Sequence, residues 1–150
     1  MRRFILFVAM IAVGFAASGA QSARAADFSS ASVSGPYACV SAGSASVKGA
    51  MTPASAVTQI TIDGKGSFSS GKQIRSTGCS YTVGSGSSYT VDSDGTGTST
   101  VNWTAAGTNP AQCPPSAPGH NSFVIQNATT IYGASNDNDA LWFVCSKQGP

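Results

Sequence analysis

The stretch that decides the predicted fold is Tyr-Thr-Val-Asp-Ser-Asp-Gly-Thr-Gly-Thr-Ser-Thr-Val, residues 89–101. It opens with the β-forming triplet Tyr89-Thr90-Val91, and β-forming residues return from Thr98 to Val101. Between them, Asp94-Gly95 is a strong signal for a short hairpin turn. The stretch therefore predicts a strand, a tight turn and a second strand.

Most of the chain after residue 33 repeats this arrangement of short β-forming runs and turns. Glu is absent and Lys is scarce, so the residues that usually fill the solvent face of a helix are missing. Loops are expected at 41–53 and 107–119, and Gly71 is expected to form a bulge or bend. Strands are expected at 34–40, 56–62, 67–75, 79–83, 88–91, 96–103, 121–126, 129–133 and 140–145. These eight or nine short strands predict an all-β antiparallel domain.

The first 25 residues have the pattern of a secretory signal peptide. Arg2 and Arg3 precede an apolar run at 4–17, and Ala23-Arg24-Ala25 offers a cleavage site before Ala26. A membrane anchor is the alternative, but the run is shorter than the roughly 20 residues that a helical span needs. We therefore expect 1–25 to be a signal peptide and 26–150 a single exported domain, periplasmic or extracellular, without a membrane span.

The charge of the expected mature chain argues against nucleic acid as a partner. After residue 25 the chain carries five basic residues and six Asp, a formal charge of −1. Proteins that bind nucleic acid need a basic stripe to neutralise phosphates, and no such stripe is present. The sequence does not indicate any other macromolecular partner.

Four cysteines, Cys39, Cys79, Cys113 and Cys145, remain in the mature chain. An even number of cysteines in an exported chain predicts two disulfides and an oxidising compartment. The spacing is unlike that of a zinc site, and there is no CxxC motif. Three pairings are possible on sequence alone.

The strand pattern favours one of these pairings. An open meander leaves two unpaired edges, which closure into an up-and-down barrel removes. In such a barrel the first and last strands are neighbours, so Cys39 would pair with Cys145. Cys79 and Cys113 would then pair and fasten the proline-rich loop to the sheet.

No catalytic site is expected. His120 is the only histidine, it lies at a loop-to-strand junction, and the chain lacks a GxSxG elbow. Paired carboxylates would have to be Asp residues, and the Asp residues after position 60 lie at predicted turns, where Asp is favoured for its own hydrogen bonds. We therefore expect a protein that is not an enzyme, with His120 at the surface.

No metal ion or cofactor is expected either. Asp92 and Asp94 partly match a calcium loop of the EF-hand type, but its twelfth position is Trp103 where a Glu is required. Residues 136–139, Asn-Asp-Asn-Asp, also offer oxygen ligands. A second Asp-Gly-x-Gly turn at Asp63 favours turn formation as the role of Asp92 and Asp94.

Three segments in this order carry a resemblance: Ser34-Gly35-Pro36-Tyr37, then 60–66, then 89–98. The chain resembles a broad group of small exported bacterial proteins with the pattern SGxY … DGxG … YTVxxDGTGT, which are taken to be lipocalin-like small β-barrels. The resemblance covers roughly residues 30 to 105 and implies a lipocalin-like barrel. It implies no catalytic residue, and the four cysteines depart from the usual pattern.

The sequence does not establish the role of this protein, and the first hypothesis is that it binds a small apolar ligand inside the barrel. A barrel of about eight strands has an interior just wide enough for side chains or for one small ligand. The alternative is a structural or surface-interaction module whose interior is fully packed. The candidate interior aromatics are Tyr37, Phe68, Tyr81, Tyr89, Trp103, Phe123, Tyr132, Trp142 and Phe143.

Overall fold

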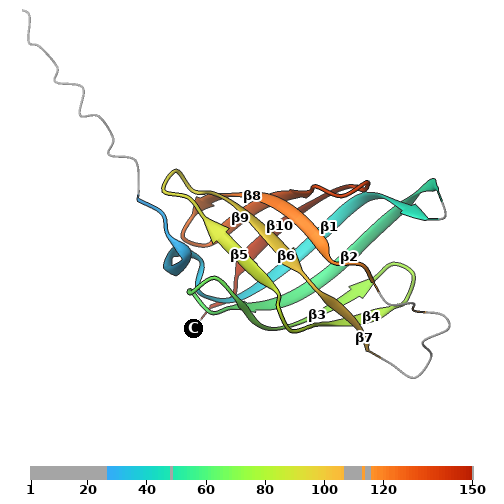
Figure 1. Ribbon diagram of the computed structural model, residues 1–150, viewed down its shortest axis with the longest axis horizontal. Coiled ribbons are helices and arrows are strands. Elements are labelled where there is room, and N and C mark those ends of the chain that lie inside the picture. Colours follow the sequence, from blue (N-terminus) through green and yellow to red (C-terminus); the bar gives the residue numbers. More distant parts are fainter. Residues whose placement is uncertain (1–26, 48, 107–112, 114–115, 150) are drawn as a thin grey trace, which may run out of the picture.

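The computed structural model describes residues 27–149 except 48, 107–112, 114 and 115, so the expected signal peptide lies outside the described residues. The described chain forms one short 3-10 helix and ten strands (Figure 1). The helix is η1 (Ser30–Val33). The strands are β1 (Gly35–Val47), β2 (Ala50–Ile62), β3 (Phe68–Arg75), β4 (Ser80–Val83), β5 (Ser88–Val91), β6 (Thr96–Val101), β7 (Trp103–Ala106), β8 (Gly119–Asn127), β9 (Thr130–Ser135) and β10 (Ala140–Lys147). No helix in this part of the chain is long and apolar enough to cross a bilayer.

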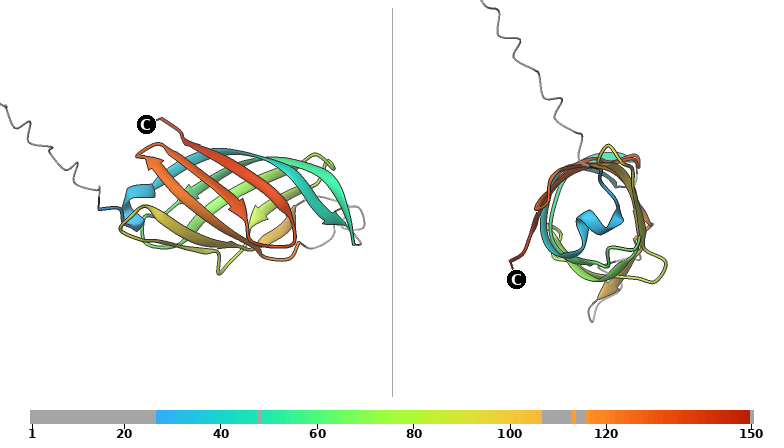
Figure 2. Two further views of the ribbon diagram at one scale, coloured as in Figure 1. Left: turned by 90° about the horizontal axis from the view of Figure 1, so that it is seen from above. Right: turned by 90° about the vertical axis from the view of Figure 1, so that its left-hand side faces the viewer.

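All strand pairs are antiparallel, and the order is β5-β6-β8-β9-β10-β1-β2-β3-β4-β7. Only Asn102 separates β6 from β7, yet β6 pairs with β5 and β8 while β7 pairs with β4. The two ends of the strand order therefore meet, and the sheet curls into a barrel (Figure 2). The prediction of a small antiparallel all-β barrel is confirmed.

The barrel is packed at the end that holds η1. Side chains facing inward there form a core in which Val33 and Tyr37 are each only 1% exposed. The other buried members of this core are Ile60, Ile62, Tyr89, Ile125, Ile131 and Cys145. Figure 2 shows η1 inside the ring of strands at this end, and the Tyr89 hydroxyl donates to the Ser30 carbonyl at 3.2 Å. We call this half of the barrel the closed half.

In three turns the side-chain oxygen of an Asp or Asn accepts hydrogen bonds from residues further along the same turn. Oδ1 of Asp94 accepts from the amide and hydroxyl of Thr96 at 2.9 and 2.7 Å, and Oδ1 of Asn127 accepts from the amide and hydroxyl of Thr129 at 2.9 and 2.8 Å. Oδ1 of Asp63 accepts from two backbone amides further along its own turn. The interpretation of the Asp-Gly-x-Gly segments as turns is therefore supported by their contacts.

The expectation of a loop at 41–53 was wrong. Strand β1 continues to Val47 and pairs with β2 as far as Val47↔Ala50. The segment has little apolar alternation, but its backbone is paired on both sides, because β1 also pairs with β10 up to Ser44↔Ala140. Ladder hydrogen bonds thus keep a Ser-, Gly- and Ala-rich segment extended where side-chain burial gives no signal.

The bulge expected at Gly71 lies elsewhere. The register shifts between Thr61↔Ser70 and Ile62↔Phe68, which leaves Ser69 as the extra residue. Gly71 lies opposite Ile60, where an added Cβ would come within 2.7 Å of Cγ2 of Val83. The absence of a side chain at Gly71 therefore permits a close approach between inward-facing neighbours.

Both disulfides join the residues that the barrel topology favours. Cys39 and Cys145 are directly opposite on β1 and β10 and are bonded, as are Cys79 and Cys113. The second bridge fastens residue 113 beside the start of β4. Two disulfides indicate a non-reducing compartment for the folded chain.

Candidate functional site

The half of the barrel away from η1 is lined by small side chains and stays accessible to solvent. On β1, Ser41, Gly43 and Ala45 have the same strand parity as the buried Tyr37, yet all three are only half-buried. Ala54 and Ala56 on β2 share the parity of Ile60 and are also half-buried. Because these inward-facing positions are small and keep partial access to solvent, we call this end of the barrel the open half.

Two aromatic rings separate the open half from the packed core. Phe123 lies between Gly97 and Gly133 in the cross-strand register, and Phe143 lies on the other side of Gly133. A Cβ added at either glycine would overlap one of these rings. Both rings are half-buried and pack against the core. We call the pair Phe123 and Phe143 the floor of the open half.

Arg75 ends β3 and shares its inward face with Gln73, because Ala56 and Thr58 of β2 are their respective partners. Its Nε donates to Oε1 of Gln73 at 2.7 Å, and its Nη2 donates to the Ser116 hydroxyl at 2.9 Å. The guanidinium carbon also lies 4.1 Å from the centre of the buried Tyr81 ring. These three contacts hold the guanidinium in a defined orientation.

No Asp side chain in the described part of the chain forms an ion pair with Arg75. Burial lowers the pKa of Arg75, while the electrostatic influence of Tyr81 and Asp139 opposes that shift. The chain has no Glu, and its six Asp residues all lie in the described part of the chain. Among the described residues the one ion pair is His120–Asp137, so no Asp lies within ion-pair distance of Arg75.

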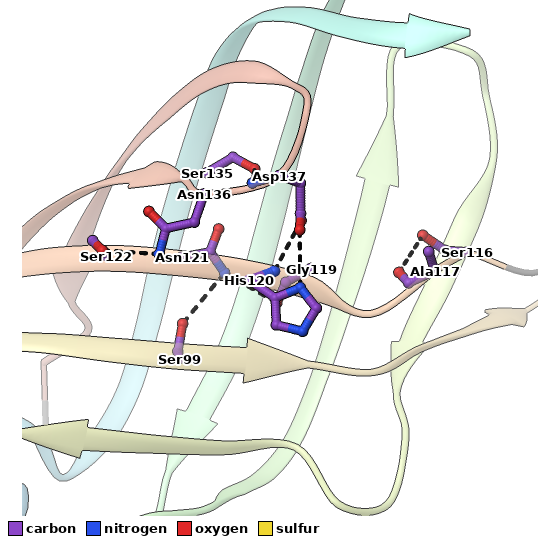
Figure 3. A network of polar contacts seen from close by, with 10 residues as sticks. All are labelled: Ser99, Ser116, Ala117, Gly119, His120, Asn121, Ser122, Ser135, Asn136 and Asp137. Carbon is purple, nitrogen blue, oxygen red and sulfur yellow. Dashed lines mark hydrogen bonds and ion pairs between the residues drawn. The ribbon is translucent and has the colours of Figure 1, made fainter. Parts of the chain in front are cut away.

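His120 and Asp137 pair on the surface at the β9–β10 turn (Figure 3). Asp137 accepts from the His120 amide through Oδ2 and contacts Nδ1 of the ring through Oδ1, both at 2.9 Å. Their side chains are 54% and 34% exposed, respectively. Partial burial raises the pKa of Asp137, but the hydrogen bonds from the amide and ring of His120 outweigh it and leave the pKa below its usual value.

This pair lacks the nucleophile of a Ser-His-Asp triad. The nearby Ser135 accepts a hydrogen bond from the Asp137 amide at 3.2 Å through its hydroxyl oxygen. No hydroxyl among the described residues hydrogen-bonds Nε2 of His120, which is the contact that activates a serine. The geometry instead fastens the β9–β10 turn to β8, with Asn136 donating to Ser122 alongside it (Figure 3).

The candidate calcium segments are not brought together into a site. Asp94 uses Oδ1 for its own turn, and within the described residues no cluster of three or more His, Cys, Asp or Glu side chains could hold a metal ion. Asp139 accepts from the Ser46 amide at 2.8 Å and so links the β9–β10 turn to β1.

Comparisons with protein-family models, curated proteins and solved structures find no match. No family is assigned to the chain from them. The resemblance to small exported bacterial barrels stays a prediction, and function must be argued from the barrel itself.

A second feature lies on the outer face. An apolar row crosses six neighbouring strands in register, and it consists of Ile74, Val57, Val40, Val144, Tyr132 and Val124. Val40 and Val57 are 53% and 55% exposed, and with Ile74 and Val144 they line a shallow surface depression. We call this set the outer row.

Sequence reasoning missed both Arg75 and the outer row. The alternation of β3 places Gln73 and Arg75 on one face, but only the pairing with β2 shows that this face is the interior. The apolar residues of the outer row can also be recognised in the sequence of each strand taken alone. Their alignment depends on the register between strands, which the sequence does not state.

Proposed function

We propose that this protein is an exported, disulfide-stabilised β-barrel that binds a small, partly apolar ligand in the open half. One observation carries the proposal: inward-facing small residues such as Ser41 and Ala56 remain half-buried, whereas Tyr37 and Ile60, further along the same inward faces, are almost fully buried. A concave, partly apolar space with a few polar groups is the usual form of a small-molecule site.

The lining supports a ligand with apolar character. Phe123 and Phe143 present half-buried rings at the floor, and Leu141 extends the inward face of β10 toward the rim. Each square ångström of apolar surface that a ligand buries there contributes about 25 cal/mol. The two disulfides and the predicted signal peptide support export to the periplasm or the exterior.

The alternative is a structural or surface-interaction module without a ligand. The outer row favours it, because contiguous exposed apolar surface is uncommon on soluble monomers and often marks a contact surface. Val40 and Val57 are its most exposed central members. In this alternative the open half would hold only water.

Native mass spectrometry of the protein purified from its own host separates the two functions. A small-molecule adduct that is lost under denaturing conditions is the expected result. Bare protein with no adduct, or an adduct that is a second polypeptide, would favour the alternative.

A matched pair of variants locates the ligand. Ala56→Phe fills the open half from inside β2, while Val57→Phe adds the same ring to the outer face one residue later. N-phenyl-1-naphthylamine, a neutral fluorophore, reports on apolar binding. We expect Ala56→Phe to abolish its fluorescence enhancement and Val57→Phe to leave it unchanged. Equal enhancement in both variants would place the probe outside the barrel.

A further inference from the structure

The open half contains an arginine that forms no ion pair with any of the described Asp side chains. Arg75 faces inward, is half-buried, and has no side-chain carboxylate within ion-pair distance among the described residues, which include every Asp of the chain. Leaving a partly desolvated charge without a counter-ion costs free energy that a paired charge would recover. An arginine in this setting is typical of an anion-binding position.

We infer that Arg75 binds the carboxylate of an amphipathic organic acid whose hydrocarbon part lies against the floor formed by Phe123 and Phe143. This inference rests on the proposed ligand-binding function and names the class of ligand. Arg75 and Phe143 belong to one inward-facing cross-strand row, Arg75↔Ala56↔Ser41↔Phe143. Only the small residues Ala56 and Ser41 separate the cation from the floor in this row. A single molecule with a charged end and an apolar body can therefore contact both.

The geometry of Arg75 fits a carboxylate. Gln73 and Ser116 accept two of the five guanidinium N–H donors, and both acceptors are neutral. Tyr81 lies against the guanidinium and fixes its plane. A planar, pre-oriented guanidinium suits the planar carboxylate group, which it can bind through two parallel hydrogen bonds.

Nearby charge favours a ligand with one negative charge over one with two. Asp139 acts electrostatically on Arg75. A doubly charged phosphate would meet one cation and the repulsion of this carboxylate. A carboxylate gains the attraction of Arg75 with less repulsion.

A purely structural role for Arg75 predicts different behaviour. Its bond to Ser116 ties the segment after Cys113 to the barrel, so Arg75 could serve only to hold that segment. In that case removal of the charge would lower stability equally with and without ligand. It would not change which ligands bind.

The test compares two probes that differ in charge alone, dansylaminoundecanoic acid and its methyl ester. The protein is unfolded in guanidinium chloride with both disulfides intact and refolded, which removes any retained ligand. Fluorescence titrations near neutral pH and low salt then give the dissociation constants. We expect the acid to bind about tenfold to hundredfold more tightly than the ester, as for a hydrogen bond to a charged group.

Arg75→Gln should remove this preference by weakening acid binding alone, with ester binding unchanged. Lys72→Gln is the matched control, since it removes a cation from the outward face of the same strand and should leave the preference intact. Circular dichroism and thermal melting check that each variant folds. If Arg75→Gln does not fold, Arg75→Lys serves instead. It should retain only part of the preference for the acid, because an ammonium cannot form the two parallel hydrogen bonds of a guanidinium.

Three outcomes overturn the inference in distinguishable ways. Equal affinity of the wild-type protein for acid and ester would reject the carboxylate while leaving ligand binding intact. An acid preference that survives in folded Arg75→Gln would assign the anion to another residue. Binding of neither probe would reject the proposed function together with this inference.

Discussion

Cys39 and Cys145 lie directly opposite each other on β1 and β10, and their disulfide covalently joins the first strand of the barrel to the last. The two positions are separated by 106 residues in the chain, whereas Cys79 and Cys113 are separated by 34. In the chain-entropy account of disulfides, the longer loop restricts the unfolded state more. The seam bridge should therefore be the more stabilising of the two.

Replacing Cys39 and Cys145 with Ala should lower the free energy of unfolding by about 2–5 kcal/mol. The corresponding change at Cys79 and Cys113 should cost about 1 kcal/mol less, by the difference in loop length. Urea unfolding of both double variants measures the difference. Equal stability of the wild type and the seam variant would show that strand pairing alone closes the barrel.

Acid should destabilise the turn that Asp94 forms. Hydrogen bonds from the side chain and then the amide of Thr96 lower the pKa of Asp94 below its ordinary 3.8. A carboxylate with a lowered native pKa contributes stability that is present above the unfolded pKa and is lost as the pH falls through the native one. Asp94→Asn should therefore be less stable than the wild type at neutral pH. The difference should shrink as the pH falls to 3.8 and vanish below the still lower native pKa.

Asn127 allows the reverse substitution in a turn with the same hydrogen-bond pattern as that of Asp94. Its Oδ1 already accepts from the amide and hydroxyl of Thr129, so Asn127→Asp should retain the turn and add a titrating group. We expect this variant to gain stability at neutral pH and lose the gain in acid. Urea midpoints measured across the pH range test both variants, and pH-independent differences would contradict the assignment.

Gly133 should not tolerate a side chain, because an added Cβ would overlap the Phe143 ring. Gly133→Ala is expected to cost about 1–3 kcal/mol, as for other overpacked interiors. Adding Phe143→Leu should recover part of the loss by making room. Gly149→Ala is the control, since nothing lies within 4 Å of a Cβ there. Thermal melts of the wild type, Gly133→Ala, Phe143→Leu and the double variant form a double-mutant cycle, with Gly149→Ala melted alongside as the control. Additive losses in the cycle would contradict the packing argument.

The outer row should be dispensable for folding. Val40→Thr and Val57→Thr together keep the β-branched shape while making two exposed positions polar. The change in stability should stay within about 0.5 kcal/mol for each substitution. Retention on a hydrophobic-interaction column should fall clearly. Unchanged retention would show that the row is not the main apolar surface of the protein.

Local patterns predicted the fold class, the barrel closure and the Asp turns. Those features depend on neighbouring residues, such as Asp94-Gly95, or on the general cost of leaving strand edges open. The extension of β1 through Ser41 and Gly43 was missed, because it depends on backbone pairing with β2 and with residues of β10 more than 90 positions away, and not on side-chain burial. The predicted position of the bulge was wrong for a similar reason. The lack of a side chain at Gly71 makes room for Val83 on a neighbouring strand, whereas the sequence rule took this glycine as a sign of a backbone bend.

The candidate site was the least predictable part. Which face of a strand lies inside is set by register, and the inward position of Arg75 follows only once β3 is aligned with β2. Small residues in a predicted strand give little indication of which face of that strand lies inside the barrel. In the barrel they are the inward-facing residues of the open half that stay half-buried.

The seam disulfide also changes what a protease can do to this protein. With Cys39 bonded to Cys145, all of the chain from residue 40 to 144 belongs to one covalent ring. A single cut anywhere in that ring opens it without releasing a fragment, so both pieces stay attached and the strands can remain paired. The folded chain thereby tolerates a nick, and only a second cut or a reductant separates the pieces.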